Sequence, residues 1–168
     1  MSRKILIGAV LTLLGVAVWL PPSSVAQTED RPSKRPASAK RSVVPAVTHK
    51  VAIQVNQNDP AVMNLALNNV KNVIEYYKEK GQKVAIEVVT YGPGLHMLRS
   101  DTSPVKDRIV PMALEHSNVT FVACANTQAN QSKAEGKPVP IMSEAKVMPS
   151  GVVRLLELQE KGYSYIRP

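Results

Sequence analysis

The 168-residue sequence contains a single cysteine, Cys124. One cysteine excludes an internal disulfide, so the core alone must hold the fold together. This cysteine and the three histidines show none of the short spacings that assemble a metal site, and we predict no metal. A phosphate-binding loop is also absent, because Gly92-Pro93-Gly94 lacks the lysine of such a loop and its proline removes an N–H donor. We therefore predict no cofactor.

Tryptophan also occurs once, as Trp19, in an apolar run over 5–20. This run is shorter than the roughly 20 residues that a membrane-spanning helix needs. A basic pair, Arg3-Lys4, precedes it, and the small residues Ser24-Val25-Ala26 follow it. The pattern predicts a signal peptide over 1–26, cleaved after Ala26, and a periplasmic or secreted protein without stable membrane insertion after cleavage. An uncleaved anchor, with Trp19 as an interfacial aromatic, is the alternative.

Acidic residues are scarce: 13 stand against 21 lysines and arginines, for a formal charge of +8. The predicted signal carries two of these positive charges. A leader over 27–48 carries a net three, is rich in Pro, Ser, Lys and Arg, and is expected to be flexible because its few apolar residues show no period. The folded part thus keeps little positive charge, and we predict no nucleic-acid partner.

From His49 onwards, short β-rich runs alternate with longer helical ones. This alternation predicts one α/β domain over 49–168, a three-layer sandwich around a central, mainly parallel sheet of about five strands, flavodoxin-like in general architecture. Strands are expected at 51–55, 84–91, 119–124, 145–148 and 163–166. The helices expected between them begin at Asp59-Pro60, at Ser103-Pro104, at Asn126 and at Ser150-Gly151.

The carboxyl ends of parallel strands lie on one side of a sheet and form its ligand crevice. Polar or glycine-containing segments follow each of the first four strands, so this edge is the predicted binding site. By contrast, His116 falls on the apolar face of its helix and is expected to be a core side chain. The candidate binding residues are Asn56, Asp59, Gly92, Gly94, His96, Asn126, Thr127, Ser150 and Gly151.

Cys124 ends the third predicted strand and directly precedes a helix. Backbone N–H groups and the dipole at a helix start favour a thiolate over a thiol, so Cys124 is the candidate catalytic residue. The alternative is a small apolar residue that closes a buried strand. His96 could lie at the rim of the crevice, but no acidic partner stands at a spacing that would make a triad.

Five local motifs carry a resemblance to a known family. They are Ala66-Leu-Asn-Asn-Val70, Val88-Val-Thr-Tyr-Gly-Pro-Gly-Leu95, Val119-Thr-Phe-Val-Ala-Cys-Ala-Asn-Thr127, Val147-Met-Pro-Ser-Gly-Val-Val153 and Leu158-Gln-Glu-Lys-Gly-Tyr-Ser-Tyr-Ile-Arg-Pro168. These motifs resemble the DsrE-like family (DsrE-, DsrF- and TusD-type proteins), and the resemblance spans about 49–168. It implies a mainly parallel α/β fold, usually assembled into trimers or hexamers. In the sulfur-relay members it implies that a cysteine at the end of the third strand carries sulfur as a persulfide, and Cys124 matches that position.

Two functions follow as hypotheses. The first is a periplasmic sulfur carrier or sulfurtransferase-like protein, with a persulfide on Cys124 and a thiol acceptor protein or small sulfur compound as partner. Export sets this chain apart from the cytoplasmic relays, so tRNA modification is not expected. The second is a non-catalytic subunit that binds a small ligand or serves assembly. In either case the edge strand at 163–166 favours a homo-oligomer that covers it, and the resemblance implies a trimer or hexamer.

Overall fold

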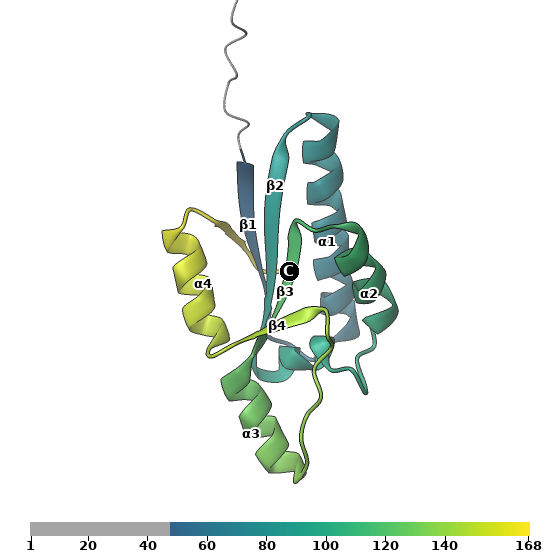
Figure 1. Cartoon of the computed structure of the whole chain (residues 1–168), viewed down its shortest axis with the longest axis vertical. Coiled ribbons are helices and arrows are strands. Elements are labelled where there is room, and N and C mark those ends of the chain that lie inside the picture. The colour runs from purple at the N-terminus through teal and green to yellow at the C-terminus, as the bar shows by residue number, and fades with distance from the viewer. Residues whose placement is uncertain (1–47) are drawn as a thin grey trace, which may run out of the picture. The chain divides into compact units, whose positions relative to one another are not determined.

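The computed structural model describes residues 48–168 (Figure 1), so the predicted signal peptide and all but the last residue of the predicted leader lie outside the described residues. A five-stranded sheet with the order β4-β3-β2-β1-β5 forms the centre, and every neighbouring pair of its strands is parallel. The predicted α/β class and central sheet are confirmed. The strands are β1 (Thr48–Val55), β2 (Lys83–Thr90), β3 (Val119–Cys124), β4 (Ala145–Met148) and β5 (Ser164–Ile166).

Helices cover both faces of the sheet, with α1 and α2 on one side and α4 on the other (Figure 1). Side chains alternate between the faces along each strand, as the two-residue period requires. On β1, for example, Ile53 faces the larger core under α1 and α2, whereas Ala52 faces the smaller core under α4. The helices are α1 (Pro60–Glu79), α2 (Lys106–Glu115), α3 (Ala125–Glu135) and α4 (Gly151–Glu160), with a 3₁₀ helix, η1 (Gly92–Leu98).

The sequence explains why β2 lies in the middle of the sheet. Its run from Val84 to Thr90 is β-branched or apolar at nearly every position, and nearly all of these residues are buried. Strands covered on both faces have this composition. One polar exception, Glu87, is buried under α4, where Arg154 binds its two carboxylate oxygens at 2.5 and 2.8 Å and ties the helix to the sheet.

The third helix, α3, covers neither face. It continues from the end of β3 beyond the carboxyl edge of the sheet (Figure 1), and none of its residues is buried. A helix without a buried apolar stripe must be held by polar contacts if it is held at all. Those contacts lie around the candidate site described below.

Local features differ from the sequence-based expectations at three places. Gly92-Pro93-Gly94 is not a simple turn but opens η1, which runs to Leu98. The helix expected from Ser103 begins at Lys106, because Ser103 and Pro104 form a preceding turn. His116 is not a core residue, since α2 ends at Glu115 and leaves the imidazole half-buried at the helix terminus. No helix within 48–168 is long and apolar enough to cross a membrane.

Candidate functional site

Cys124 is the last residue of β3 and the N-cap of α3. Its Sγ accepts a hydrogen bond from the Thr127 N–H at 3.5 Å, in the geometry in which N-cap side chains satisfy the free amides of a first turn. The predicted position of the thiol at a helix start is thereby confirmed. Thr127 itself is fixed from the other side, because its Oγ1 accepts the Gly92 N–H at 2.9 Å.

A second helix also begins at this thiol. The backbone N–H of Gly151, the first residue of α4, is among the hydrogen-bonding groups that act on Cys124. Residue 151 must be glycine for this approach. A Cβ there would lie 2.9 Å from the Cβ of Tyr91 and 3.3 Å from the Cβ of Cys124. The starts of α3 and α4 therefore converge on one sulfur atom.

Burial and hydrogen bonding act on the Cys124 thiol in opposite directions. Burial raises its pKa, because a low-dielectric environment disfavours the thiolate. The Thr127 side chain and the backbone amides of Gly151, Thr127 and Asn126 lower it, and together they outweigh burial. The pKa of Cys124 is thus held below its usual range, and the site favours an anion at Sγ.

The same cysteine is less accessible than the sequence suggested. Only 4% of its surface is exposed, and it is not among the residues that line the cavity between η1 and α3, although its place at the carboxyl edge of the sheet predicted an accessible thiol. The cysteine nevertheless lies near the protein surface, because the neighbouring residues Asn126 and Pro149 are exposed. A reagent would reach Sγ only after a local movement, and the start of α4 at Gly151 packs against the cysteine.

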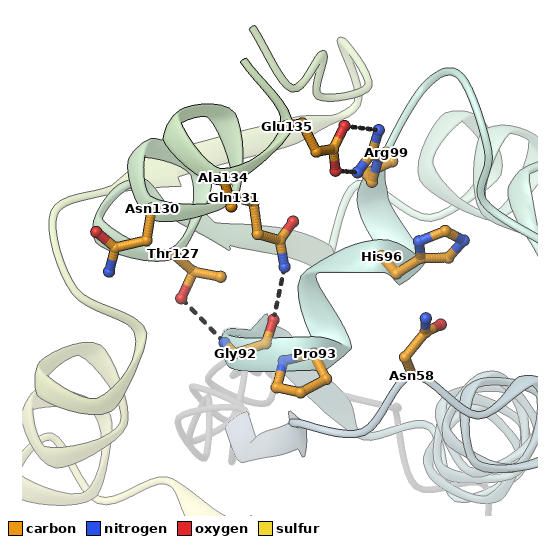
Figure 2. A pocket seen from close by; sticks show the side chains of 10 residues that line it. All are labelled: Asn58, Gly92, Pro93, His96, Arg99, Thr127, Asn130, Gln131, Ala134 and Glu135. Atoms are coloured by element: carbon orange, nitrogen blue, oxygen red, sulfur yellow. Dashed lines mark hydrogen bonds and ion pairs between the residues drawn. The ribbon is translucent and has the colours of Figure 1, made fainter. Parts of the chain in front are cut away.

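A cavity of about 580 Å³ lies next to this thiol, between η1 and α3 (Figure 2). Thr127 belongs to both places, because it lines the cavity and contacts Sγ. Of the predicted binding residues, the cavity brings together three: Gly92, His96 and Thr127. The complete lining is Asn58, Gly92, Pro93, His96, Arg99, Thr127, Asn130, Gln131, Ala134 and Glu135.

Charge in the cavity is concentrated in one ion-pair cluster. The Arg99 side chain, 8% exposed, pairs with Asp101 and with Glu135 of α3. Both carboxylates bind it through two oxygens, and these hydrogen bonds raise the pKa of Arg99 and lower the pKa values of Asp101 and Glu135. The cluster also joins the end of η1 to the last turn of α3.

The remaining predicted site residues have local structural roles. Asp59 caps α1 by accepting the Ala61 N–H at 2.8 Å, and Ser150 caps α4 by accepting the Val153 N–H. Gly94 is buried against the backbone of β1, where a Cβ would lie 2.3 Å from the carbonyl oxygen of Val55. Asn56 is half-buried and Asn126 exposed, and neither lines the cavity. Within 48–168, no group of three or more acidic, histidine or cysteine side chains is arranged to hold a metal ion.

Sequence reasoning missed Arg99, Gln131 and Glu135. Arg99 and Glu135 are 36 residues apart, and Gln131 contacts Gly92 across 39 residues. No local pattern marks either pair. The one available signal was the spacing of Thr127, Gln131 and Glu135 at four-residue steps, which places three polar side chains on one face of an otherwise featureless helix.

Comparison with solved structures finds proteins of similar fold. The solved structure of MTH1491, a protein of unknown function from Methanobacterium thermoautotrophicum, aligns with 29% sequence identity and a TM-score of 0.61. The alignment covers 71% of this chain and 99% of that one. No family model matches the sequence, and no curated protein does. This chain is therefore similar in fold and sequence to an archaeal protein of unknown function.

Proposed function

We propose that this chain is an exported DsrE-like protein that carries sulfur as a persulfide on Cys124. The observation that carries the proposal is the convergence of the Asn126, Thr127 and Gly151 amides on one sulfur atom, which stabilises negative charge there. A persulfide is anionic at neutral pH and needs the same stabilisation as a thiolate. An ordinary buried cysteine lacks this stabilisation, since burial in a packed core raises the pKa of a thiol.

The transfer chemistry requires no oxidant. The Cys124 thiolate attacks the outer sulfur of thiosulfate, the S–S bond of thiosulfate breaks, and sulfite leaves with the bonding electron pair. The product is the Cys124 persulfide. An acceptor thiolate then attacks its terminal sulfur, a new persulfide forms on the acceptor, and Cys124 returns as thiolate.

Access to the thiol is the step that the protein must control. With 4% of its surface exposed, Cys124 reacts only after a movement that opens its surroundings, and the start of α4 at Gly151 lies against it. Such an opening is local, because Gly151 is the first residue of α4 and helix ends open at low free-energy cost. Burial would then protect the persulfide between donor and acceptor.

A second candidate function is binding of a small ligand without catalysis. The cavity between η1 and α3 favours it, because its volume is in the range of ligand sites and seven of its ten lining residues carry a polar side chain beside apolar surface. In that role Cys124 serves only as the N-cap of α3. The two functions differ in their dependence on the thiol.

Intact-mass spectrometry separates them. The purified protein is incubated with thiosulfate or polysulfide and compared with its Cys124→Ser variant, which retains an N-cap side chain. Under the first function, only the cysteine form gains the mass of one sulfur atom, and a thiol reductant removes it. Reaction of a parallel sample with iodoacetamide shows that the thiol is accessible to reagents. If the cysteine form reacts with iodoacetamide but gains no sulfur from thiosulfate or polysulfide, the carrier proposal fails.

The location and partners that we propose follow from the same hypothesis. The protein would act in the periplasm or outside the cell, with residues 1–26 removed, as a homo-oligomer that meets a small sulfur compound or a thiol acceptor protein. Trp19 gives a simple measurement, because it is the only tryptophan and lies in the predicted signal. Tryptophan fluorescence in the protein isolated from cells would contradict cleavage after Ala26.

A further inference from the structure

The cavity between η1 and α3 contains an imidazole whose hydrogen-bonding role is fixed. His96 Nε2 lies 3.0 Å from the carbonyl oxygen of Thr102. A carbonyl oxygen can only accept, so Nε2 carries the proton. In the neutral ring, Nδ1 then has a free lone pair and acts as an acceptor.

A second acceptor comes from Gln131 of α3. Its Nε2 donates to the carbonyl oxygen of Gly92 at 3.2 Å, which fixes the orientation of the amide because the reversed amide would place two oxygens together. Its Oε1 is left buried, and it is the one such side-chain atom within 48–168 that has no hydrogen-bond partner. An unpaired buried acceptor is unfavourable, so a donor that reached it would be favoured.

The charged groups of the cavity are already satisfied by one another. Arg99 uses its Nε, Nη1 and Nη2 on Asp101 and Glu135, and both carboxylates are bound through two oxygens. No free guanidinium face remains for a phosphate or carboxylate ligand. The extra negative charge of the cluster is offset by nearby Lys137, whose charge acts on Glu135. The cavity thus selects for hydrogen-bonding groups rather than for net charge.

Side chains around the opening complete the recognition surface. Asn58 and Asn130 line the cavity from opposite sides, and Figure 2 shows both amides beside the hollow with no hydrogen bond to the other residues drawn. Each amide can donate and accept. Pro93 and Ala134 add apolar surface between the polar groups.

We propose that this cavity binds a small uncharged polyol of monosaccharide size. Hydroxyl groups donate to the fixed acceptors of His96 and Gln131 and pair in both directions with Asn58 and Asn130, while the C–H surface of a sugar ring packs on Pro93. A volume of about 580 Å³ admits a monosaccharide with several ordered waters. This inference rests on the ligand-binding candidate function and is independent of Cys124.

The test is a titration followed by two-dimensional ¹H–¹⁵N NMR with three sugars that share a pyranose ring: glucose (uncharged), glucosamine (cationic) and glucuronate (anionic). We expect saturable shifts of the Gly92 and Thr127 amides and of the Gln131 side-chain amide with glucose, and weaker binding of both charged sugars. Asn130→Ala, at an exposed position, should weaken glucose binding, and Gln131→Leu should weaken it about tenfold for the loss of one hydrogen bond. Gln159→Leu, on the exposed part of α4, should leave it unchanged.

Other outcomes overturn the inference in distinguishable ways. Tighter binding of glucosamine or glucuronate at these same amides would reject an uncharged ligand but keep the cavity as a binding site. Saturable shifts confined to other parts of the domain, or no saturable shift with any of the three sugars, would reject the polyol, whereas the carrier function is decided separately by the intact-mass comparison. Unchanged glucose affinity in folded Asn130→Ala and Gln131→Leu would reject the assigned contacts.

Discussion

Thr127 makes contacts on both sides of the candidate site. Its N–H donates to Cys124 Sγ, its Oγ1 accepts from Gly92, and its side chain lines the cavity. Because Oγ1 accepts the Gly92 N–H, its own O–H is free to donate to the sulfur, and the Thr127 side chain is the first of the groups that lower the thiol pKa. A change at this one residue should therefore be measurable at the sulfur.

Replacing Thr127 with Val removes the hydroxyl but preserves the shape of the side chain. We expect the pKa of Cys124 to rise, because the mutation removes a hydrogen bond that stabilises the thiolate. The backbone amides still lower the pKa in part. The ultraviolet absorbance of the thiolate, titrated against Cys124→Ser as a blank, measures it. The control is Thr120→Val, on the strand β3 that ends at Cys124, which should leave the titration unchanged. An unchanged titration in Thr127→Val would contradict the assigned role of the hydroxyl.

The lowered thiol pKa also predicts how stability changes with pH. The native pKa of Cys124 lies below that of the unfolded chain, so the unfolded state binds more protons between the two values. The free energy of unfolding should rise, relative to Cys124→Ser, as the pH rises through the native pKa, and should level off once the unfolded thiol also ionises. Urea unfolding over a series of pH values measures this difference. A gap between the two proteins that is independent of pH would show that the thiol pKa is not lowered.

Gly94 shows how a predicted binding residue can have a structural role. A Cβ at this position would lie 2.3 Å from the carbonyl oxygen of Val55, which is backbone and cannot move aside. We expect Gly94→Ala to destabilise the domain by about 3 kcal/mol, the upper end of the usual cost of overpacking. Gly81→Ala is the control: its position has an open environment and a φ of +63°, so it should cost only about 1–2 kcal/mol of left-handed strain. Equal costs in urea unfolding would contradict the close approach of η1 to β1.

At the scale of elements, α3 depends on polar contacts in place of a core. Thr127 and Gln131 bind Gly92, Glu135 binds Arg99, and Gln128 and Ser132 both bind the backbone of Val139. The helix has no buried residue that would otherwise fix it. Its position beside η1, and with it the cavity, should be the part of the described domain most sensitive to loss of an ion pair.

Acid should therefore release α3 before it unfolds the sheet. Arg99 holds the pKa values of Asp101 and Glu135 below their usual values of about 3.8 and 4.5, so the pairs stabilise the structure fully above these unfolded values and lose this effect as the pH falls from them towards the lowered native pKa values. Hydrogen exchange read by mass spectrometry should show early loss of protection in α3. Glu135→Gln should show the same loss at neutral pH, whereas Glu160→Gln on exposed α4 should not. Simultaneous loss of protection in α3 and the sheet would contradict an independently docked helix.

The elements themselves were largely predictable, and the reasons are local. Helix starts at Asp59-Pro60 and Ser150-Gly151 follow from capping chemistry that acts within three residues, and the structure confirms both caps. The position of Cys124 at the end of β3 follows in the same way. The start of α2 was displaced because Ser103 bonds the Val105 N–H in a turn before the helix, which competes with an N-cap role.

Across the whole domain, the alternation of strands and helices predicted the layers but not the contacts between distant segments. Sheet order decides that η1 meets α3, and this meeting creates the cavity and pairs Arg99 with Glu135. Likewise, the approach of α4 to the thiol depends on the pairing of β4 with β3, because β4 leads into α4. The burial of Cys124 could therefore not be predicted from its polar neighbours in the sequence. Local chemistry specified each group, and only the tertiary fold determined its partners.

Assembly is the prediction that belongs to the whole molecule. Within 48–168, the strands β4 and β5 form the edges of the sheet, and α4 exposes an apolar stripe of Val152, Val153 and Leu156. Unpaired edges and exposed apolar stripes favour self-association, so we expect a homo-oligomer in light scattering. Leu156→Lys, at a position 56% exposed, should dissociate it, because a charge would have to be buried in the interface. Leu114→Lys, on α2 at the opposite face and 77% exposed, should not. A monomeric wild type, or an unchanged mass in Leu156→Lys, would contradict an interface at α4.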